Sequence, residues 1–364
     1  MKYAVVFLLL CSAFFSRLNA QAPIKPSVIA YYTGNEEEIK KFPLASLTHI
    51  IYSFFKLDGD TLAFIRPHQR ETLRSLVALK KSYPGLKVMV ALGGWGGCKP
   101  CSPQFAKKEV REKFAGSVVK LLREYGADGL DLDWEYPGIE GFPGHPWMKE
   151  DVPNFTELVR DLRSAMGNRY ELSFAAGGFT SFLEQAAEWD KVMPLVDRVN
   201  LMTYDLVSGF SKQTGHHTPL HATSQQKEAT DHCVDYLLSI GVPASKLVIG
   251  AAFYARVWKD VPDINNGLYQ PGEFKTMFGY KKFDSTFTSA EGFKLYWDET
   301  ARAPYYYSVS RKEFATFDSK ESIAAKTRYM LNKKLGGIMF WELSGDKYNG
   351  GLLTEITNTI NSHK

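Results

Sequence analysis

The sequence predicts an α/β fold in which eight parallel strands close into a (β/α)8 TIM barrel, with a small α+β insertion between strands 7 and 8. Short apolar segments alternate eight times with amphipathic helical patterns along the chain. One long interval interrupts that alternation ahead of the last apolar segment. Acidic and aromatic side chains follow the predicted strands, at the end of such a barrel where active sites lie.

The predicted strands are short runs rich in apolar, β-branched and aromatic residues. In order they are residues 28–32, 48–54, 87–92, 129–135, 171–176, 198–204, 246–253 and 337–341. One intervening helix carries an apolar stripe that ends at Gly126, a typical stop signal. A later helix is predicted to begin at Asp318, because Glu321 three residues on completes a capping pattern.

The interval from 258 to 316 is too long for an ordinary crossover and is rich in tyrosine, phenylalanine and glycine. It is predicted to form a small inserted α+β subdomain. Two interpretations remain open for it. It either builds a wall beside the active site or only buries its own aromatic residues.

Residues 1–20 read as a secretory signal peptide, with Lys2, an apolar run over 4–15, and Ala20 before Gln21. A membrane anchor is the alternative, but the apolar run is too short to span a bilayer. We therefore expect a protein secreted or exported to a periplasm, with residues 21–364 forming one large catalytic domain. The net charge is +4, and basic and acidic residues are interspersed along the chain. This pattern disfavours a nucleic-acid binder, which would show a basic stripe.

The cysteines of the exported chain predict no metal site. Cys98 and Cys101 have metal or redox spacing, but no second pair accompanies them, so a local disulfide on a loop is preferred. Cys233 lies on an apolar helical stripe and is predicted to be a core residue. His216 and His217 are assigned to a polar loop with no metal role.

The most informative segment places Asp131, Asp133 and Glu135 at alternate positions of an otherwise apolar strand. A strand sends such residues to one face, and burying several acids together opposes folding unless function requires them. A solvated face and a calcium site are the alternatives. Because Pro137 and Gly138 end the segment, the acids lie near the strand's carboxyl end, which favours proton transfer to or from a substrate.

Aromatic residues gather at the ends of several other predicted strands. The positions are Tyr31, Tyr32, Phe54, Trp95, Tyr204, Phe253, Tyr254 and Trp341, with the polar groups Asp205, Arg256 and Glu342 beside them. Sugar rings stack their CH faces on aromatic side chains while acids and amides bind the hydroxyls. The mixture indicates a carbohydrate cleft.

These residues resemble the chitinases of glycoside hydrolase family 18. The resemblance rests on Asp128-x-x-Asp131-x-Asp133-x-Glu135 and covers essentially the whole mature chain. Supporting motifs are Gly93-Gly94-Trp95, Met202-x-Tyr204-Asp205, Tyr254-x-Arg256 and the segment from Gly336 to Trp341. The resemblance also implies an α+β insertion before the last strand.

The resemblance implies a retaining hydrolase of β-1,4-linked N-acetylglucosamine that recruits the substrate's acetamido group, without a cofactor or metal. Glu135 would be the general acid and base, and Asp133 would hold the acetamido N–H with Asp131 behind it. Tyr204 would orient the acetamido oxygen. Because like charges this close cannot all ionise easily, Asp131 and Asp133 are expected to share a proton. The pKa of Glu135 is expected to be raised.

The same resemblance assigns further contacts. Trp341 would form the floor under the sugar whose bond is cleaved, near Tyr31 and Phe54, and Trp95 would stack on a sugar further along the chain. Met202, Asp205, Tyr254 and Arg256 would contact the substrate, whereas Asp128 is out of phase with the other acids and is expected to be structural.

One departure from the family pattern is Ala91, where a serine is common. Loss of the serine hydroxyl is expected to weaken hydrogen bonding to the acidic strand by about 1 kcal/mol.

Two other functions remain open. A different N-acetylglucosamine glycan could be the substrate of an endo-β-N-acetylglucosaminidase, or the chain could be a non-catalytic chitin-binding lectin, although such lectins typically lack the acid at Glu135. We expect a monomer whose partner is chitin or a chitooligosaccharide, with neither nucleic acid nor membrane as a partner.

Overall fold

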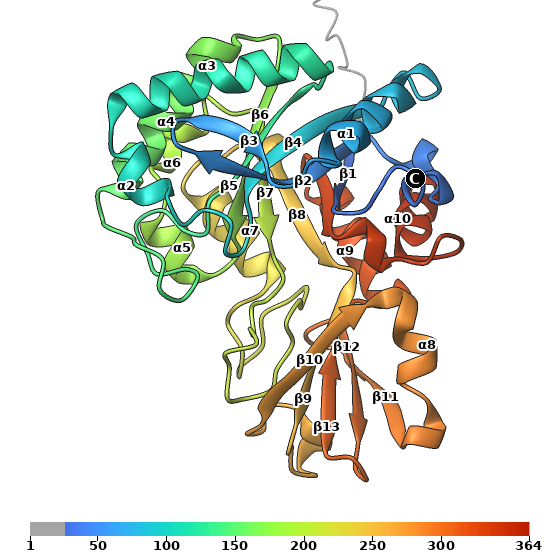
Figure 1. Ribbon diagram of the computed structural model, residues 1–364. Helices are drawn as coiled ribbons and strands as arrows, with labels where there is room; N and C mark the ends of the chain where they lie inside the picture. The colour runs from blue at the N-terminus through green and yellow to red at the C-terminus, as the bar shows by residue number, and fades with distance from the viewer. Residues whose placement is uncertain (1–25, 364) are drawn as a thin grey trace, which may run out of the picture.

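The computed structural model describes residues 26–363, so the predicted signal peptide lies outside the described residues. Eight parallel strands form a closed barrel (Figure 1). They are β1 (Ser27–Tyr32), β2 (His49–Asp58), β4 (Lys87–Gly93), β5 (Gly129–Asp133), β6 (Glu171–Gly177), β7 (Arg198–Met202), β8 (Leu247–Ala252) and β14 (Gly337–Trp341). The first strand pairs with both β2 and β14, which closes the ring. The predicted (β/α)8 fold is therefore confirmed.

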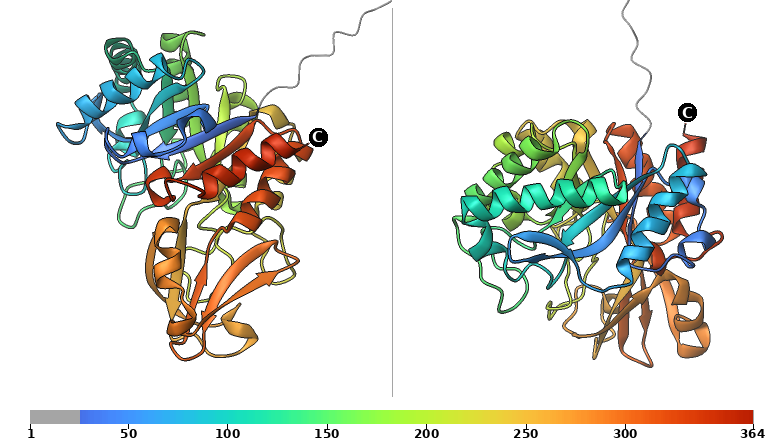
Figure 2. Two further views of the ribbon diagram at one scale, coloured as in Figure 1. Left: turned by 90° about the vertical axis from the view of Figure 1, so that its right-hand side faces the viewer. Right: turned by 45° about the horizontal axis from the view of Figure 1, so that its top comes forward.

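Helices surround the barrel, as the two views of Figure 2 show. The α-helices of the barrel layer are α1 (Gln69–Ala78), α2 (Cys101–Phe105), α3 (Lys108–Tyr125), α4 (Asp151–Met166), α5 (Thr180–Gln185), α6 (Trp189–Val192), α7 (Thr230–Ser239), α9 (Lys320–Asn332) and α10 (Leu352–Ser362). The end of α3 agrees with the prediction, because Gly126 caps it at a φ of 73° that favours glycine. Within residues 26–363, no helix is both long and apolar enough to cross a lipid bilayer.

The predicted start of α9 was wrong by one residue. Ser319 is the N-cap, and it forms a reciprocal capping box with Ser322. Asp318 is instead fully buried, where it accepts hydrogen bonds from the backbone of Ala252 and from Lys326. Asp318, which the sequence pattern predicted to be a cap, instead links helix α9 to strand β8 through these hydrogen bonds.

A strand that the sequence analysis did not anticipate extends the sheet at β2. Strand β3 (Thr61–Phe64) pairs antiparallel with the second half of β2, across a two-residue turn at Gly59 and Asp60. Aspartate and glycine are common in such hairpin turns, so this signal was present in the sequence.

The long interval forms a second, five-stranded antiparallel sheet that projects from the barrel (Figure 1, orange). Its strands lie in the order β10 (Glu273–Gly279), β9 (Tyr254–Lys259), β13 (Glu313–Thr316), β12 (Ala303–Ser308) and β11 (Phe293–Asp298), with the short helix α8 (Phe283–Thr286) alongside. This sheet begins at Tyr254, directly after β8, so position 258 lies inside its first strand. Side chains alternate across the sheet, with Tyr306 on one face and Tyr305 and Tyr307 on the other.

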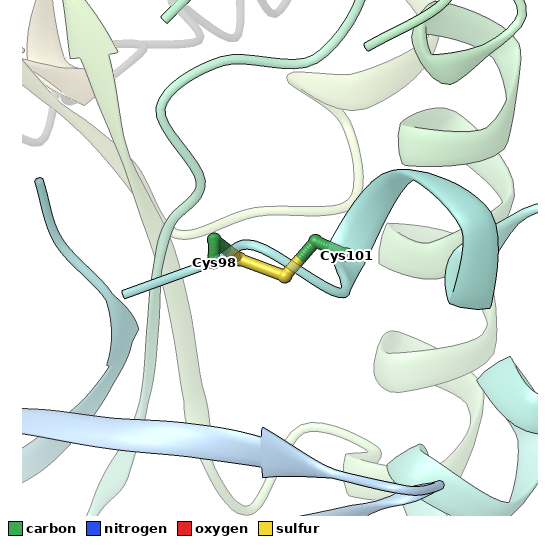
Figure 3. Close-up of a disulfide and its surroundings, with 2 residues drawn as sticks. All are labelled: Cys98 and Cys101. Atoms are coloured by element: carbon green, nitrogen blue, oxygen red, sulfur yellow. A yellow bond between two sulfur atoms is a disulfide. The ribbon is translucent and has the colours of Figure 1, made fainter. Parts of the chain in front are cut away.

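The cysteines agree with their predictions. Cys98 and Cys101 form a disulfide that joins the loop after β4 to the start of α2 (Figure 3). Cys233 is a buried free cysteine in α7 and packs in the layer between the strands and helices.

Candidate active site

A cleft of about 930 Å³ opens at the carboxyl ends of the barrel strands, and the second sheet forms one of its sides. Ten of the residues singled out in the sequence line it. They are Phe54, Trp95, Asp133, Glu135, Met202, Tyr204, Asp205, Tyr254, Arg256 and Trp341. The architecture thus brings these residues from five barrel strands or their following loops, and from β9, to a single pocket.

Three carboxylates follow one another from the barrel interior toward the cleft. They are Asp131 and Asp133 of strand β5 and Glu135 just after it, and we call them the acidic strand group. Asp131 is fully buried inside the barrel, and Asp133 is the last residue of the strand. Glu135 lies two residues beyond the strand end and is half-buried in the cleft wall. The predicted strand to residue 135 was therefore too long, and Glu135 leaves the sheet near the cleft opening.

Asp131 is held by three hydrogen-bond donors from three different strands. The hydroxyl of Tyr31 donates to Oδ2 at 2.7 Å, the hydroxyl of Ser173 donates to Oδ1 at 2.6 Å, and the amide of Asn200 donates to Oδ1 at 3.0 Å. Burial raises the pKa of Asp131, and these three donors oppose that rise by stabilising the carboxylate. Asp131 therefore has a fixed orientation beneath Asp133.

Asp133 and Glu135 are surrounded differently. Burial, followed by the charges of Glu135 and Asp131, raises the pKa of Asp133 well above its ordinary value. Within residues 26–363, no group donates a hydrogen bond to its Oδ1. Burial also raises the pKa of Glu135 to about 7, and the charge of Asp205 adds to that rise, while a hydrogen bond with Tyr136 opposes it. Asp133 therefore has the stronger resistance to ionisation of the two aspartates, and Glu135 can both give and take a proton near neutral pH.

Ser173 and Asn200 are polar residues of the site that the sequence analysis missed. Asp131 is in register with Ala91 of strand β4 on one side and with Ser173 of strand β6 on the other. A hydroxyl is thus supplied to Asp131 by the neighbour opposite Ala91, and the weakening expected at Ala91 stays a prediction. The available signal was a lone serine and a lone asparagine in apolar strands.

Aromatic residues form the floor of the cleft. Trp341 stacks on Phe54 with ring centroids 5.3 Å apart and lies 5.9 Å from the ring of Tyr31. Tyr31 itself is fully buried beneath this layer, so it supports Asp131 and does not line the cleft. Burial raises the pKa of Tyr204 well above its ordinary value, which keeps its hydroxyl protonated as a donor.

A charged pair also lines the cleft, and we call Asp205 and Arg256 the wall pair. Arg256 donates two hydrogen bonds to the carboxylate, and Tyr254 donates a third at 2.6 Å. Burial opposes ionisation of Asp205, but hydrogen bonds and charges from His217 and Arg256 together lower its pKa below the ordinary value. Asp205 stays ionised and keeps 37% of its side-chain surface exposed.

The remaining lining comes from residues that the sequence analysis did not single out, and those from β10 support the interpretation of the insertion as a wall beside the site. Strand β10 contributes Phe274, Lys275, Thr276 and Met277, and loops after the barrel strands contribute Tyr136, Gly177, Phe179, Leu206, Ser208, Gly209 and Phe210. These residues follow no motif, and only the packing of the second sheet against the barrel brings β10 to the cleft.

Three residues that the sequence analysis kept out of the site, Asp128, His216 and His217, do not line the cleft. Asp128 precedes β5 and accepts hydrogen bonds from Lys80 and from the backbone of Val88, both at 2.7 Å, which gives it structural partners. His216 and His217 lie in a loop, as predicted, and both are buried. His216 contacts Asp298 at 3.1 Å, and His217 lies 3.5 Å from Asp205. Across the described chain, no cluster of three His, Cys, Asp or Glu could hold a metal ion.

Comparison with known proteins relates this geometry to one family. The family model described as glycosyl hydrolases family 18 matches residues 27–346. Chitinase A1 of Niallia circulans is 35% identical over 299 residues, which cover 76% of this chain but only 43% of that protein. Chitotriosidase-1 of Mus musculus is 30% identical, with 85% of this chain and 69% of the relative covered.

Solved structures give the same result. A chitinase from Bacillus thuringiensis superposes with a TM-score of 0.86 at 27% identity, over 93% of this chain and 70% of that chain. A family 18 N-acetylglucosaminidase from Paenibacillus barengoltzii has a TM-score of 0.83 at 33% identity, over 92% of this chain and 99% of that chain.

Proposed function

Because the chain belongs to the glycosyl hydrolases of family 18, we propose that it cleaves β-1,4 bonds between N-acetylglucosamine units of chitin or chitooligosaccharides. The observation that carries this proposal is the acidic strand group. One half-buried carboxyl with a pKa of about 7 lies at the cleft, and beneath it lie Asp133, whose pKa is also raised, and then the hydrogen-bonded Asp131. This is an arrangement for a single acid and base.

The proposed reaction uses the substrate's own acetamido group as the nucleophile. Protonated Glu135 gives its proton to the glycosidic oxygen while the bond from that oxygen to the anomeric carbon breaks. The acetamido carbonyl oxygen bonds to the same carbon and forms an oxazolinium ion. Glu135, now ionised, takes a proton from water as that water opens the ring, so the anomeric configuration is retained.

Asp133 and Tyr204 complete this chemistry in the proposal. The unpartnered Oδ1 of Asp133 is available to accept the acetamido N–H, which holds the carbonyl in position and stabilises the cationic ring. The protonated hydroxyl of Tyr204 is available to donate to the acetamido oxygen. Fixing the internal nucleophile in this way raises its effective concentration at the anomeric carbon.

The aromatic surfaces and the wall pair bind the polymer. Trp341, stacked on Phe54, offers a flat floor to the sugar at the cleaved bond. Met202, Tyr254 and the wall pair, Asp205 and Arg256, surround the same sugar, and Asp205 keeps acceptor oxygens exposed for hydroxyl groups. Trp95 stacks on a sugar further along the chain.

We also propose that the protein is exported as a monomer, with residues 1–20 as its signal peptide. Residues 21–364 then act as a catalytic unit in which 258–316 belong to the inserted subdomain. N-terminal sequencing of the protein purified from culture medium or periplasm tests this, since a mature start at Gln21 is expected.

The decisive experiment compares acetylated chitin hexamer with the fully de-acetylated hexamer, with products followed by mass spectrometry. Cleavage of the acetylated chain alone is expected, because only that chain carries the nucleophile. Equal cleavage of both contradicts the mechanism. Binding of the acetylated chain without cleavage indicates a lectin, and cleavage only of an N-glycan core indicates the endo-β-N-acetylglucosaminidase.

A further inference from the structure

Trp95 has little packing of its own to hold it in the cleft wall. Its side chain is 48% exposed, and its ring touches Phe142, Phe210 and Tyr136 at centroid distances of 5.4, 6.2 and 6.5 Å. Phe210 is 66% exposed, so it is a weak support. The position of the Trp95 ring therefore depends mainly on the backbone that carries it.

That backbone is rich in glycine, because close approach leaves no room for side chains. A Cβ on Gly93 would lie 2.2 Å from the carbonyl oxygen of Asp133, and one on Gly97 would lie 2.0 Å from the carbonyl oxygen of Gly93. Gly94 and Gly96, on either side of Trp95, have φ angles of 78° and 83°. Glycine loses the most conformational freedom on ordering, and this segment has no side chains with which to anchor itself.

The backbone is tied down on its N-terminal side by strand β5. The N–H of Gly94 donates to the carbonyl oxygen of Asp133 at 2.8 Å, which links the loop directly to the acidic strand group. Only one further bond lies within the loop, from the N–H of Gly97 to Gly94. The C-terminal side needs an anchor of its own.

The disulfide supplies that anchor immediately after the last glycine. Cys98 follows Gly97, and Cys101 is the first residue of helix α2 (Figure 3). Both cysteines are buried in the layer between strands and helices, together with Phe105 of the same helix. The Sγ of Cys98 also lies 3.5 Å from the Cβ position of Gly93, so the disulfide packs against the start of the loop that it ends.

The short span of the bond points to a local effect. A disulfide restricts the unfolded chain more when it closes a longer loop, and this one joins residues only three apart. Its largest effect is therefore on the order of the adjoining segment. We propose that the Cys98–Cys101 disulfide is a positioning device that holds Trp95 in place to bind long chitin chains. This inference rests on the proposed function of Trp95.

The test uses the Cys98→Ala/Cys101→Ala double variant with two substrates. The Michaelis constant for chitin hexamer is expected to rise about tenfold, as for loss of a stacked sugar contact. The kinetic constants for a short fluorogenic chitobioside are expected to stay within about twofold of the wild type. Unchanged hexamer kinetics, or equal losses on both substrates, would overturn the proposal.

A matched cycle separates positioning from general destabilisation. Trp95→Ala should raise the hexamer Michaelis constant by a similar factor, and the triple variant should be no worse than Trp95→Ala alone. Additive losses would show that the disulfide acts elsewhere.

Hydrogen exchange tests the same inference without any activity. In the double variant, the amides of Gly94 and Gly97 should exchange at least about tenfold faster, while those of β4 and β5 stay protected. Unchanged exchange would overturn the positioning role. If the loop is loosened but the wild type cleaves neither substrate, the proposed function fails while the anchoring of the loop stands.

Discussion

The acidic strand group and the wall pair contribute carboxylates to the same cleft, and the pKa values of these carboxylates are shifted in opposite directions. In the acidic strand group, burial raises the pKa of all three acids. In the wall pair, burial also opposes ionisation of Asp205, yet its pKa falls below the ordinary value. The difference comes from the partners, since Asp205 has a guanidinium, a tyrosine hydroxyl and a histidine around it, whereas Asp133 and Glu135 have mainly other acids.

This contrast supports two different tasks that we propose for one pocket. An acid that exchanges protons near neutral pH must have a pKa close to that pH, which burial among other acids achieves for Glu135. An acid that only binds hydroxyl groups functions best when it is permanently ionised, which Arg256 achieves for Asp205. The charged neighbours of each carboxyl therefore decide whether its pKa is raised or lowered, and burial alone does not.

The largest expected effect breaks the acidic strand group itself. Glu135→Gln should lower kcat by at least about a hundredfold, because the amide cannot donate a proton to the leaving oxygen. Steady-state kinetics on chitin hexamer measure this, and binding of the hexamer by calorimetry should remain close to that of the wild type. A variant with near-normal turnover would remove Glu135 from the mechanism.

The pH profile connects the two groups. Because Glu135 must be protonated to act as the acid and its pKa is about 7, kcat/KM should fall about tenfold per pH unit above that pH. The charge of Asp205 raises the pKa of Glu135. Asp205→Asn should therefore lower that pKa and move the alkaline limb toward lower pH.

Glu135→Asp is the useful comparison for that profile, since it shortens the acid but leaves Asp205 and its charge in place. A limb that does not move in Asp205→Asn would mean that the wall pair and the acidic strand group titrate independently.

A smaller effect tests the support beneath Asp131. Ser173→Ala removes one of three donors, which costs about 1 kcal/mol and should lower kcat about fivefold. Ser173→Thr keeps the hydroxyl and should retain activity. Ala91→Ser placed in the Ser173→Ala background returns a hydroxyl from the opposite strand, and kinetic assays should show partial recovery. No recovery would mean that β4 and β6 are not equivalent supports.

The smallest effect is on thermal stability, with opposite pH dependence in the two groups. The raised pKa of Glu135 contributes stability that is present at acidic pH and lost as pH rises through about 7. Glu135→Gln should therefore raise Tm by about 1–3 °C at pH 8 and have less effect at pH 4.

The lowered pKa of Asp205 gives the reverse sign. It contributes stability above the ordinary aspartate pKa that is lost as pH falls. Asp205→Asn should lower Tm by about 1–3 °C at pH 7, and the difference should shrink below about pH 4. Calorimetric scans of both variants across this range check the contrast, and equal pH dependence in the two would refute it.

Local pattern in the sequence was sufficient for the barrel and for the centre of the site. Strand and helix periods reveal which segments repeat, and the geometry of a single strand places Asp131 and Asp133 on one face, with Glu135 two residues beyond the strand end. The disulfide was also predictable, since its two cysteines are three residues apart. Each of these features depends on residues that are neighbours along the chain.

Tertiary structure decided how those segments support one another. Ser173 is 42 residues from Asp131, and Arg256 is 51 residues from Asp205. Such pairs depend on strand register, on closure of the barrel and on the packing of β10 beside the cleft. No local period encodes these distant contacts, so the sequence by itself determined which acids are present, and the fold determined which neighbours raise or lower the pKa of each.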